Sequence, residues 1–173
     1  MSVTLLLYRR RLLPSLAGSN VYFILELSGA WELATIQELG DLVQAQNLVA
    51  VFLAETWLDE VRLSGLCDTL LLKNFFGVSS CGGGLAIFRK QEFDLQVVNS
   101  SSNFIDTIIN RDKDDVWRFI SFYGAPKTSR HPESWNLLRG LNTLTFIPWL
   151  CAGDFNEITK TDEKLGGWTQ PNN

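Results

Sequence analysis

The sequence predicts a mixed α/β domain in which two β-sheets pack face to face and helices cover them. Helical and strand-like segments alternate along the chain, and internal repeats are absent. Some strand-like segments are separated by helices and others by tight turns, which is typical of mixed sheets with hairpins. The 173 residues, of which 46% are hydrophobic and 20% are charged, suffice for one domain with a sizeable core. A dinucleotide-binding fold is not supported, because no G-x-G-x-x-G follows a strand.

The predicted elements follow from periodicity and turn chemistry. Ile36, Leu39, Leu42 and Val43 recur at helical spacing and predict a helix that begins at about Glu32 and ends near Asn47. Strands are expected where apolar, β-branched or aromatic residues run between turns. Two further helices are predicted at 59–66 and 131–144, and strands at 21–25, 48–54, 69–72, 85–88, 94–98, 105–109, 116–123 and 148–152.

The N-terminal residues differ in composition from the remainder of the chain. We expect residues 1–20 to be a divergent, poorly ordered leader and residues 21–173 to form one partial domain. Arg9 to Arg11 precede an apolar run, as in a secretion signal, but Pro14 and polar residues interrupt that run. No stretch reaches the roughly 18 apolar residues of a membrane helix. We therefore expect an intracellular protein, nuclear or cytoplasmic, without a membrane partner.

Cysteine usage and net charge exclude several classes of protein. Cys67, Cys81 and Cys151 are far apart and odd in number, so we expect buried apolar side chains rather than a disulfide framework or a zinc site. This usage fits a reducing compartment. The formal net charge of -4 argues against a protein that coats nucleic acid by bulk electrostatics. It does not exclude a nuclease whose carboxylates hold a cation.

Two apolar strands end in carboxylates that could carry chemistry. Glu55 follows the run from Leu48 to Ala54, and Asp154 follows the run from Pro148 to Ala152. Carboxylates on rigid strand ends can fix the oxygen ligands that a hard cation needs. Taken singly, such a carboxylate is more often simply solvated. For the pair, a site and a solvated strand end are about equally supported.

A tyrosine at the end of a third strand is the next candidate. Tyr123 lies in Phe122-Tyr123-Gly124-Ala125-Pro126 and could donate a hydrogen bond to a phosphate oxygen. Taken alone, a core-edge aromatic ring with its hydroxyl group in water is the commoner case.

The ordered motifs of the chain resemble a known family. From about Thr35 to Pro171 the chain is similar to the endonuclease domain of plant LINE-type retrotransposons, within the endonuclease/exonuclease/phosphatase superfamily. Gly-Asp-Phe-Asn at 153–156 is the most specific of these motifs. The others are Glu55-Thr56, Gly82–Phe88, Ile105-Asp106, Trp117–Phe119, Phe122–Pro126, Glu133–Arg139, Pro148–Ile158 and Asp162–Gly167.

The resemblance implies a DNase I-like four-layer α/β sandwich that hydrolyses a DNA phosphodiester with Mg²⁺ or Mn²⁺. It implies that Glu55 is a metal ligand and that Asp154 orients or deprotonates the attacking water. It further implies that Asn156 helps to place this water and that Tyr123 touches the scissile phosphate. Such a domain acts on DNA, and in the full-length element a reverse-transcriptase region accompanies it.

The chain departs from the family pattern at both ends. The first strand is divergent: no segment matches the family's metal-site Asn, and Glu26 occupies roughly its place by ungapped counting. The family's terminal Ser-Asp-His segment is not found before Asn173, so we expect an incomplete sandwich without its C-terminal strands. His131, the single histidine, is expected on the surface rather than in catalysis. Little or no activity is therefore expected from this chain alone.

Two other interpretations remain open at the level of sequence. The chain could be a non-catalytic remnant or a binding module with the same fold, which the missing histidine segment favours. It could also belong to the same superfamily and act on phosphoinositide or RNA. The motifs taken together match the retrotransposon branch best.

Overall fold

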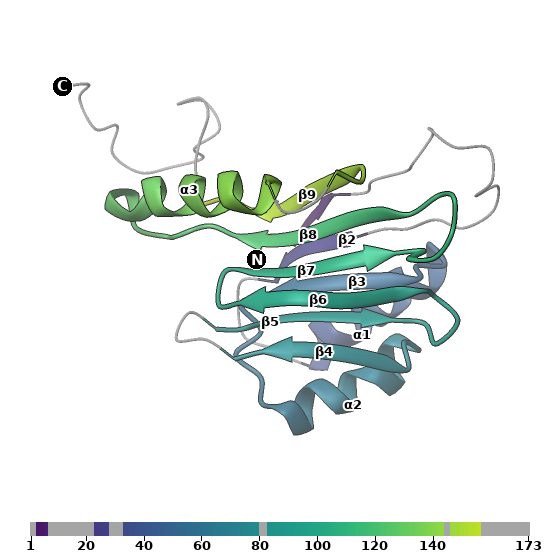
Figure 1. Ribbon diagram of the computed structural model, residues 1–173. Helices are drawn as coiled ribbons and strands as arrows, with labels where there is room; N and C mark the ends of the chain where they lie inside the picture. The colour runs from purple at the N-terminus through teal and green to yellow at the C-terminus, as the bar shows by residue number, and fades with distance from the viewer. Residues whose placement is uncertain (1–2, 7–22, 28–32, 80–82, 144–145, 157–173) are drawn as a thin grey trace.

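The computed structural model describes residues 3–6, 23–27, 33–79, 83–143 and 146–156. Three helices and nine strands lie within these ranges, together with a short 3-10 turn, η2 (Figure 1). In chain order they are β1 (Val3–Leu6), β2 (Phe23–Leu27), α1 (Leu33–Ala45), β3 (Ala50–Ala54), α2 (Glu60–Leu70), β4 (Asn74–Val78), β5 (Leu85–Arg89), β6 (Leu95–Ser101), β7 (Phe104–Ile109), β8 (Trp117–Tyr123), η2 (Thr128–Arg130), α3 (His131–Asn142) and β9 (Trp149–Asp154).

Two sheets form the centre of the domain. The first has the strand order β3-β5-β4, and both of its pairings are antiparallel. The second has the order β6-β7-β8-β9, and its last pair, β8 with β9, is parallel. A parallel pair requires a crossover connection, and α3 supplies it. The carboxyl ends of β8 and β9 consequently lie side by side.

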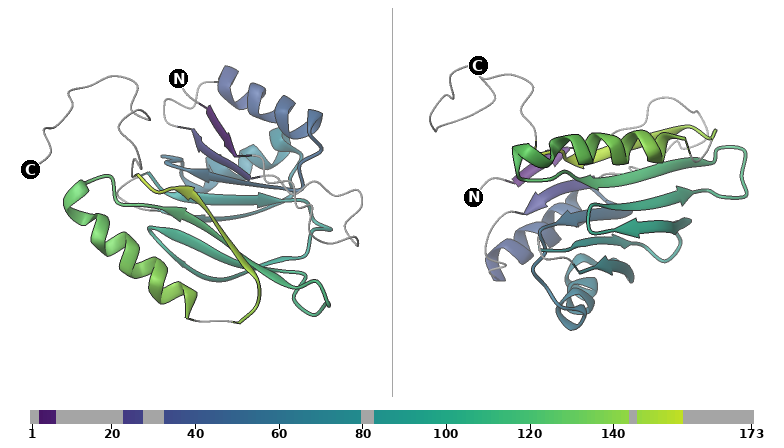
Figure 2. Two further views of the ribbon diagram at one scale, coloured as in Figure 1. Left: turned by 90° about the horizontal axis from the view of Figure 1, so that it is seen from above. Right: turned by 60° about the vertical axis from the view of Figure 1, so that its left-hand side comes forward.

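Three apolar cores separate four layers of secondary structure. The outer face of the β3-β5-β4 sheet packs against α1 and α2. The inner faces of the two sheets pack against each other through Phe52, Ile87, Ile105 and Phe119. The remaining face of the second sheet is covered by α3 (Figure 2). The predicted sandwich of two sheets with helices outside is confirmed.

Most predicted elements are present with shifted ends, but the strand predicted at 69–72 is wrong. Leu70 is the last residue of α2, and Leu63, Leu66, Cys67 and Leu70 form its buried face. Leu71 then takes a left-handed conformation that closes the helix. The apolar residues at 69–72 therefore continue a helical face before the chain turns. The strand that follows, β4, was not predicted.

The N-terminal pair of strands includes four residues of the predicted leader. β1 lies within residues 1–20, and it pairs antiparallel with β2. β2 in turn lies beside β3 (Figure 1). Most of the predicted leader lies outside the described residues, so the boundary at residue 20 remains a prediction. Within the described residues, none of the helices has the length and apolarity to cross a membrane.

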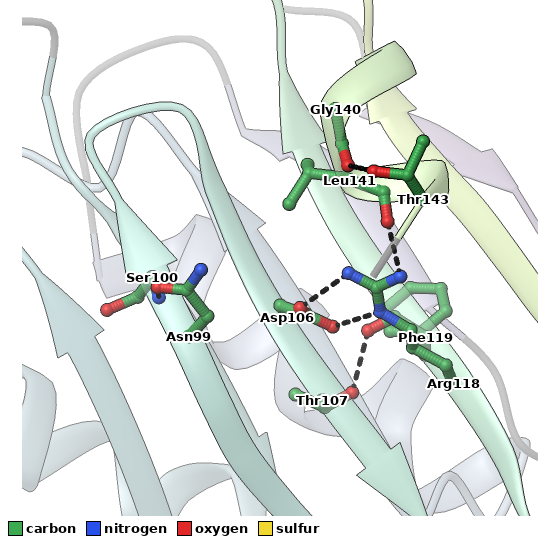
Figure 3. A network of polar contacts seen from close by, with 9 residues as sticks. All are labelled: Asn99, Ser100, Asp106, Thr107, Arg118, Phe119, Gly140, Leu141 and Thr143. Atoms are coloured by element: carbon green, nitrogen blue, oxygen red, sulfur yellow. Dashed lines mark hydrogen bonds and ion pairs between the residues drawn. The ribbon is translucent and has the colours of Figure 1, made fainter. Parts of the chain in front are cut away.

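A buried ion pair joins α3 to the second sheet. Arg118 of β8 donates two hydrogen bonds of 2.7 Å to the carboxylate of Asp106 in β7 (Figure 3). A further bond of 2.6 Å runs from Arg118 to the carbonyl oxygen of Leu141, at the end of α3. The two charged side chains are only 1% and 3% exposed. The pair therefore replaces the water that both charges lose on folding, and it fixes the end of α3.

Candidate functional site

The carboxyl ends of β8 and β9 bring two of the predicted site residues together. Tyr123 and Asp154 are the last residues of these strands, and they are paired across the parallel ladder. The backbone N–H of Gly124 donates to the carbonyl oxygen of Asp154 at 2.7 Å and extends the pairing by one step. At the other side of β8, the side-chain amide of Asn103 donates to the carbonyl oxygen of Tyr123 at 3.0 Å. Tyr123 is therefore held through its backbone from both sides.

The third predicted residue reaches the same place from the other sheet. Glu55 directly follows β3, whose five residues are all buried. The hydroxyl group of Tyr123 donates a hydrogen bond to the carboxylate of Glu55. Glu55 is half-buried and Tyr123 is buried. This contact joins the ends of β3 and β8, which belong to different sheets.

The loop after β9 places Asn156, the fourth residue. Its backbone N–H donates to the Asp154 carboxylate at 2.7 Å, and its side-chain amide donates to the carbonyl oxygen of Gly124 at 2.9 Å. The first bond fixes one oxygen of Asp154 in a tight local turn. The second ties the loop to the end of β8. Asp154 and Asn156 are thus set in place by the backbone around them.

An aromatic stack supports this loop from the side of α3. The ring of Phe155 lies 5.4 Å from that of Phe122 and 6.2 Å from that of Trp135, between centroids. Phe122 belongs to the core beneath α3, and Trp135 lies on α3 itself. At the start of the same helix, Ser134 accepts a 2.9 Å bond from the backbone of Ala125. α3 therefore holds the segments after β8 and after β9.

The environment of Tyr123 keeps its phenol protonated. Burial raises the pKa of Tyr123 well above its ordinary value, and the hydrogen bond to Glu55 raises it further. The amide of Asn156 lowers this pKa, whereas the negative charges of Glu55 and Asp154 raise it. These contributions place all four predicted residues in one electrostatic environment. A neutral phenol at this point acts as a hydrogen-bond donor.

Backbone conformations that side chains rarely adopt gather around the cluster. Glu55, Trp57 and Asn156 have φ values of 53°, 48° and 53°. Left-handed conformations cost of order 1–3 kcal/mol in residues other than glycine, and they occur often at functional sites. The strain accordingly lies in the two segments that carry the candidate ligands.

Two further residues of the sequence analysis are Glu26, which is described only in part, and His131. Glu26 lies in β2, beside β3, but its side chain is outside the described residues. His131 begins α3 and is half-buried, and its predicted place outside catalysis stays a prediction. It occupies the entry to a helix, where its ring is partly covered. The motif at Asp162–Gly167 and Cys81 also lie outside the described residues.

The sequence did not single out Trp57 or Phe155. Trp57 follows Glu55 by two residues, and Phe155 lies within the Gly-Asp-Phe-Asn motif, so both were next to predicted residues. Only the fold reveals that the Phe155 ring stacks on α3 and that the Trp57 side chain faces solvent.

Cation binding at this cluster would rest on two carboxylates. Among the described residues there is no group of three or more His, Cys, Asp and Glu side chains arranged to hold a metal ion. Mg²⁺ commonly uses one or two carboxylates and keeps several water molecules or substrate oxygens. The hard oxygen donors of Glu55 and Asp154 fit that ion, whereas a softer metal would call for histidine or cysteine.

Cys151 should be unreactive in the folded protein. Burial raises the pKa of the Cys151 thiol to about 12, although the charge of Arg118 lowers it somewhat. At pH 8 its thiolate fraction is then about a thousand-fold below that of a free cysteine. We expect alkylation of Cys151 by iodoacetamide to be slower by at least that factor, measured by peptide mass spectrometry. The same chain in guanidinium chloride is the control and should react fully; rapid alkylation of the folded chain would contradict the burial.

Comparison with known proteins identifies the fold. No protein-family model and no curated protein matches the sequence. Among solved structures, the chain is similar to the endonuclease domain of TRAS1, a telomere-specific non-LTR retrotransposon, with a TM-score of 0.53 and 13% identity over 74% of this chain. The AP endonuclease LMAP from Leishmania major has a TM-score of 0.53 and 14% identity over 79% of this chain. Humanized D. rerio TDP2 has a TM-score of 0.56 and 11% identity over 80% of this chain.

The matched part is shorter than these structures themselves. The chain spans 56% of the TRAS1 domain, 54% of LMAP and 67% of the D. rerio protein. Identities this low establish a shared architecture and leave the activity to be argued from the site. The chain has the DNase I-like α/β fold.

Proposed function

We propose that the chain carries a Mg²⁺- or Mn²⁺-dependent DNA endonuclease site that hydrolyses a phosphodiester bond. The observation that supports this proposal is the convergence of Glu55, Tyr123, Asp154 and Asn156 at one end of the sandwich. The four residues come from the ends of β3, β8 and β9. They offer carboxylates for a cation and a water molecule, and neutral donors for phosphoryl oxygens.

The roles follow from the chemistry of each group. When bound, the cation would stabilise the charge that grows on the phosphoryl oxygens. Glu55 would hold the cation, and Asp154 would orient the attacking water or take its proton. The amide of Asn156 would help to place this water. The phenol of Tyr123 would donate to a phosphoryl oxygen.

The hydrogen bond between Tyr123 and Glu55 suggests an exchange of partners. In the structure the phenol donates to the carboxylate that we assign to the cation. An arriving phosphate would accept this donor instead, and Glu55 would then face the cation with its full charge. Substrate binding and cation binding would therefore favour each other.

DNA is the substrate that best fits the proposal. The names of two similar structures are those of endonucleases, one from a retrotransposon and one acting as an AP endonuclease. Together with the motif order of this sequence, they favour DNA over phosphoinositide or RNA. We also propose a retrotransposon origin of the plant LINE type, in which a reverse-transcriptase region would accompany this domain.

A non-catalytic module of the same fold is the second candidate. The small number of ligands favours it, because the described residues present only two carboxylates at the cluster and no larger group of ligating side chains. Such a module would bind DNA or a partner without cleaving it. Nicking of DNA separates the two candidates.

Replacing Asp154 with alanine should abolish whatever Mg²⁺-dependent nicking the chain shows. We expect a loss of at least about 10²-fold, the usual effect of removing one group from such a site. Tyr123→Phe removes only the phenolic donor, and we expect it to lower the nicking rate by a similar factor. Supercoiled plasmid is incubated at high enzyme concentration and for long times, since slow nicking is expected.

Asp112→Ala is the matched control, because this exposed carboxylate lies in the β7–β8 turn. The Asp112→Ala variant should nick plasmid DNA as fast as the unchanged chain. Equal nicking by the Asp154 variant would reject the proposed site. Absence of nicking from the unchanged chain would favour the non-catalytic module. A calorimetric Mn²⁺ titration provides a readout without DNA, and Glu55→Gln should weaken that binding.

A further inference from the structure

The side chain of Trp57 faces solvent directly beside the candidate site. It is 65% exposed, although an indole ring is among the side chains that gain most from burial. Glu55 and Trp57 flank Thr56, which is itself 1% exposed. The segment thus buries its small polar residue and presents its largest aromatic residue to solvent.

Backbone contacts hold Trp57 in this position. Its φ of 48° is strained for an aromatic residue. The Thr56 hydroxyl donates to the carbonyl oxygen of Gly83 at 3.0 Å, and the N–H of Trp57 donates to the same oxygen. A Cβ atom on Gly83 would lie 2.7 Å from Nε1 of Trp57 and 2.8 Å from Cα of Glu55. The indole therefore rests on a glycine backbone that also borders Glu55.

A shallow hollow lies against the indole. It has a volume of about 270 Å³ and is lined by Trp57, Leu58, Asp59, Ser79 and Gly83. Pockets that enclose drug-sized ligands are larger, at about 300–1,000 Å³. The dimensions and the mixed lining suit one flat ring system with polar edges, stacked on the indole.

We infer that Trp57 is a stacking platform for one nucleobase of the strand whose phosphate lies at the Glu55–Tyr123–Asp154 cluster. The inference rests on the proposed function and specifies its substrate: DNA that is single-stranded or locally unpaired beside the scissile phosphate. In a continuous duplex both faces of each base are already covered, and unstacking costs a few kcal/mol. An unpaired base stacks on an aromatic ring without that cost.

Binding of a local fluorescent probe tests the inference separately from cleavage. The probe is a 12-mer with phosphorothioate linkages and one 2-aminopurine, offered as a single strand and as a duplex in Mg²⁺. Stacking quenches 2-aminopurine, so we expect quenching with the single strand and the unchanged chain. Trp57→Ala should remove the quenching and raise the Kd for the single strand about ten-fold or more. Its Kd for the duplex should change less than three-fold.

Control variants keep the result interpretable. Trp57→Phe should restore most of the quenching, and Val61→Ala, at an 81% exposed position on α2, should change nothing. Far-UV circular dichroism checks that each variant is folded.

Equal single-strand binding by the unchanged chain and Trp57→Ala would overturn the inference while plasmid nicking still supports the nuclease. An altered sedimentation coefficient of Trp57→Ala would overturn it in favour of a contact between copies of the chain. Absence of binding to any DNA would overturn both proposals.

Discussion

Replacing Arg118 with alanine should lower the free energy of unfolding by about 3–5 kcal/mol, which is a large part of the stability of a domain of this size. The variant would leave the Asp106 carboxylate buried without its two charge-assisted hydrogen bonds. It would also leave the carbonyl oxygen of Leu141 without its donor. Urea denaturation followed by circular dichroism measures the loss.

Two comparisons separate the cost of an unpaired charge from the value of the pair. Changing both partners, as Arg118→Met with Asp106→Leu, should be much less damaging than either single change, because no charge is then stranded. The exposed pair between Arg130 and Glu133 is the surface control, and its loss should cost about 1 kcal/mol or less. A loss below about 1 kcal/mol for Arg118→Ala would mean that water reaches the Asp106 carboxylate.

The sequence predicted the layers because their signals are local. The helical spacing of Ile36, Leu39 and Val43, and the unbroken apolar run before Glu55, depend on residues close together in the chain. The prediction at 69–72 failed where a local signal is ambiguous. A short apolar run is compatible both with the end of a helix and with a strand. Only the burial of Leu70 on the same helical face as Leu63 and Leu66 decides between them.

The candidate site was predictable to the extent that it lies at strand ends. Glu55 and Asp154 were marked by the apolar runs before them. Whether these two carboxylates lie close together depends on the arrangement of the strands, since β3 belongs to one sheet and β9 to the other. The contact between Tyr123 and Glu55 spans 68 residues of sequence, and no local pattern reports it.

No local sequence pattern predicts the exposure of Trp57 either. Apolar composition predicts burial on average. The outward position of this indole results from the left-handed backbone and from the Gly83 contact, both of which are tertiary features.

Gly153→Ala should destabilise the fold and disrupt the candidate site together. A Cβ atom at this position would lie 1.7 Å from the carbonyl oxygen of Phe122, and backbone atoms occupy that space. Because Phe122 and Gly153 are paired across β8 and β9, the two strands must separate at their carboxyl ends. We expect a loss of at least about 3 kcal/mol in urea denaturation, above the usual cost of an added methyl group.

Two helical glycines provide matched controls for the same chemical change. A Cβ atom on Gly65 or Gly140 would have no heavy atom within 4 Å. Alanine at either position should stabilise the protein by about 0.5–1 kcal/mol, since glycine weakens a helix by that amount. If Gly153→Ala matched these variants in stability, the close approach of β8 and β9 would be wrong. Because Asp154 follows Gly153 directly, a folded Gly153→Ala chain should also bind Mn²⁺ more weakly than the Gly65→Ala chain, which connects the geometry of this strand pair to the site at its end.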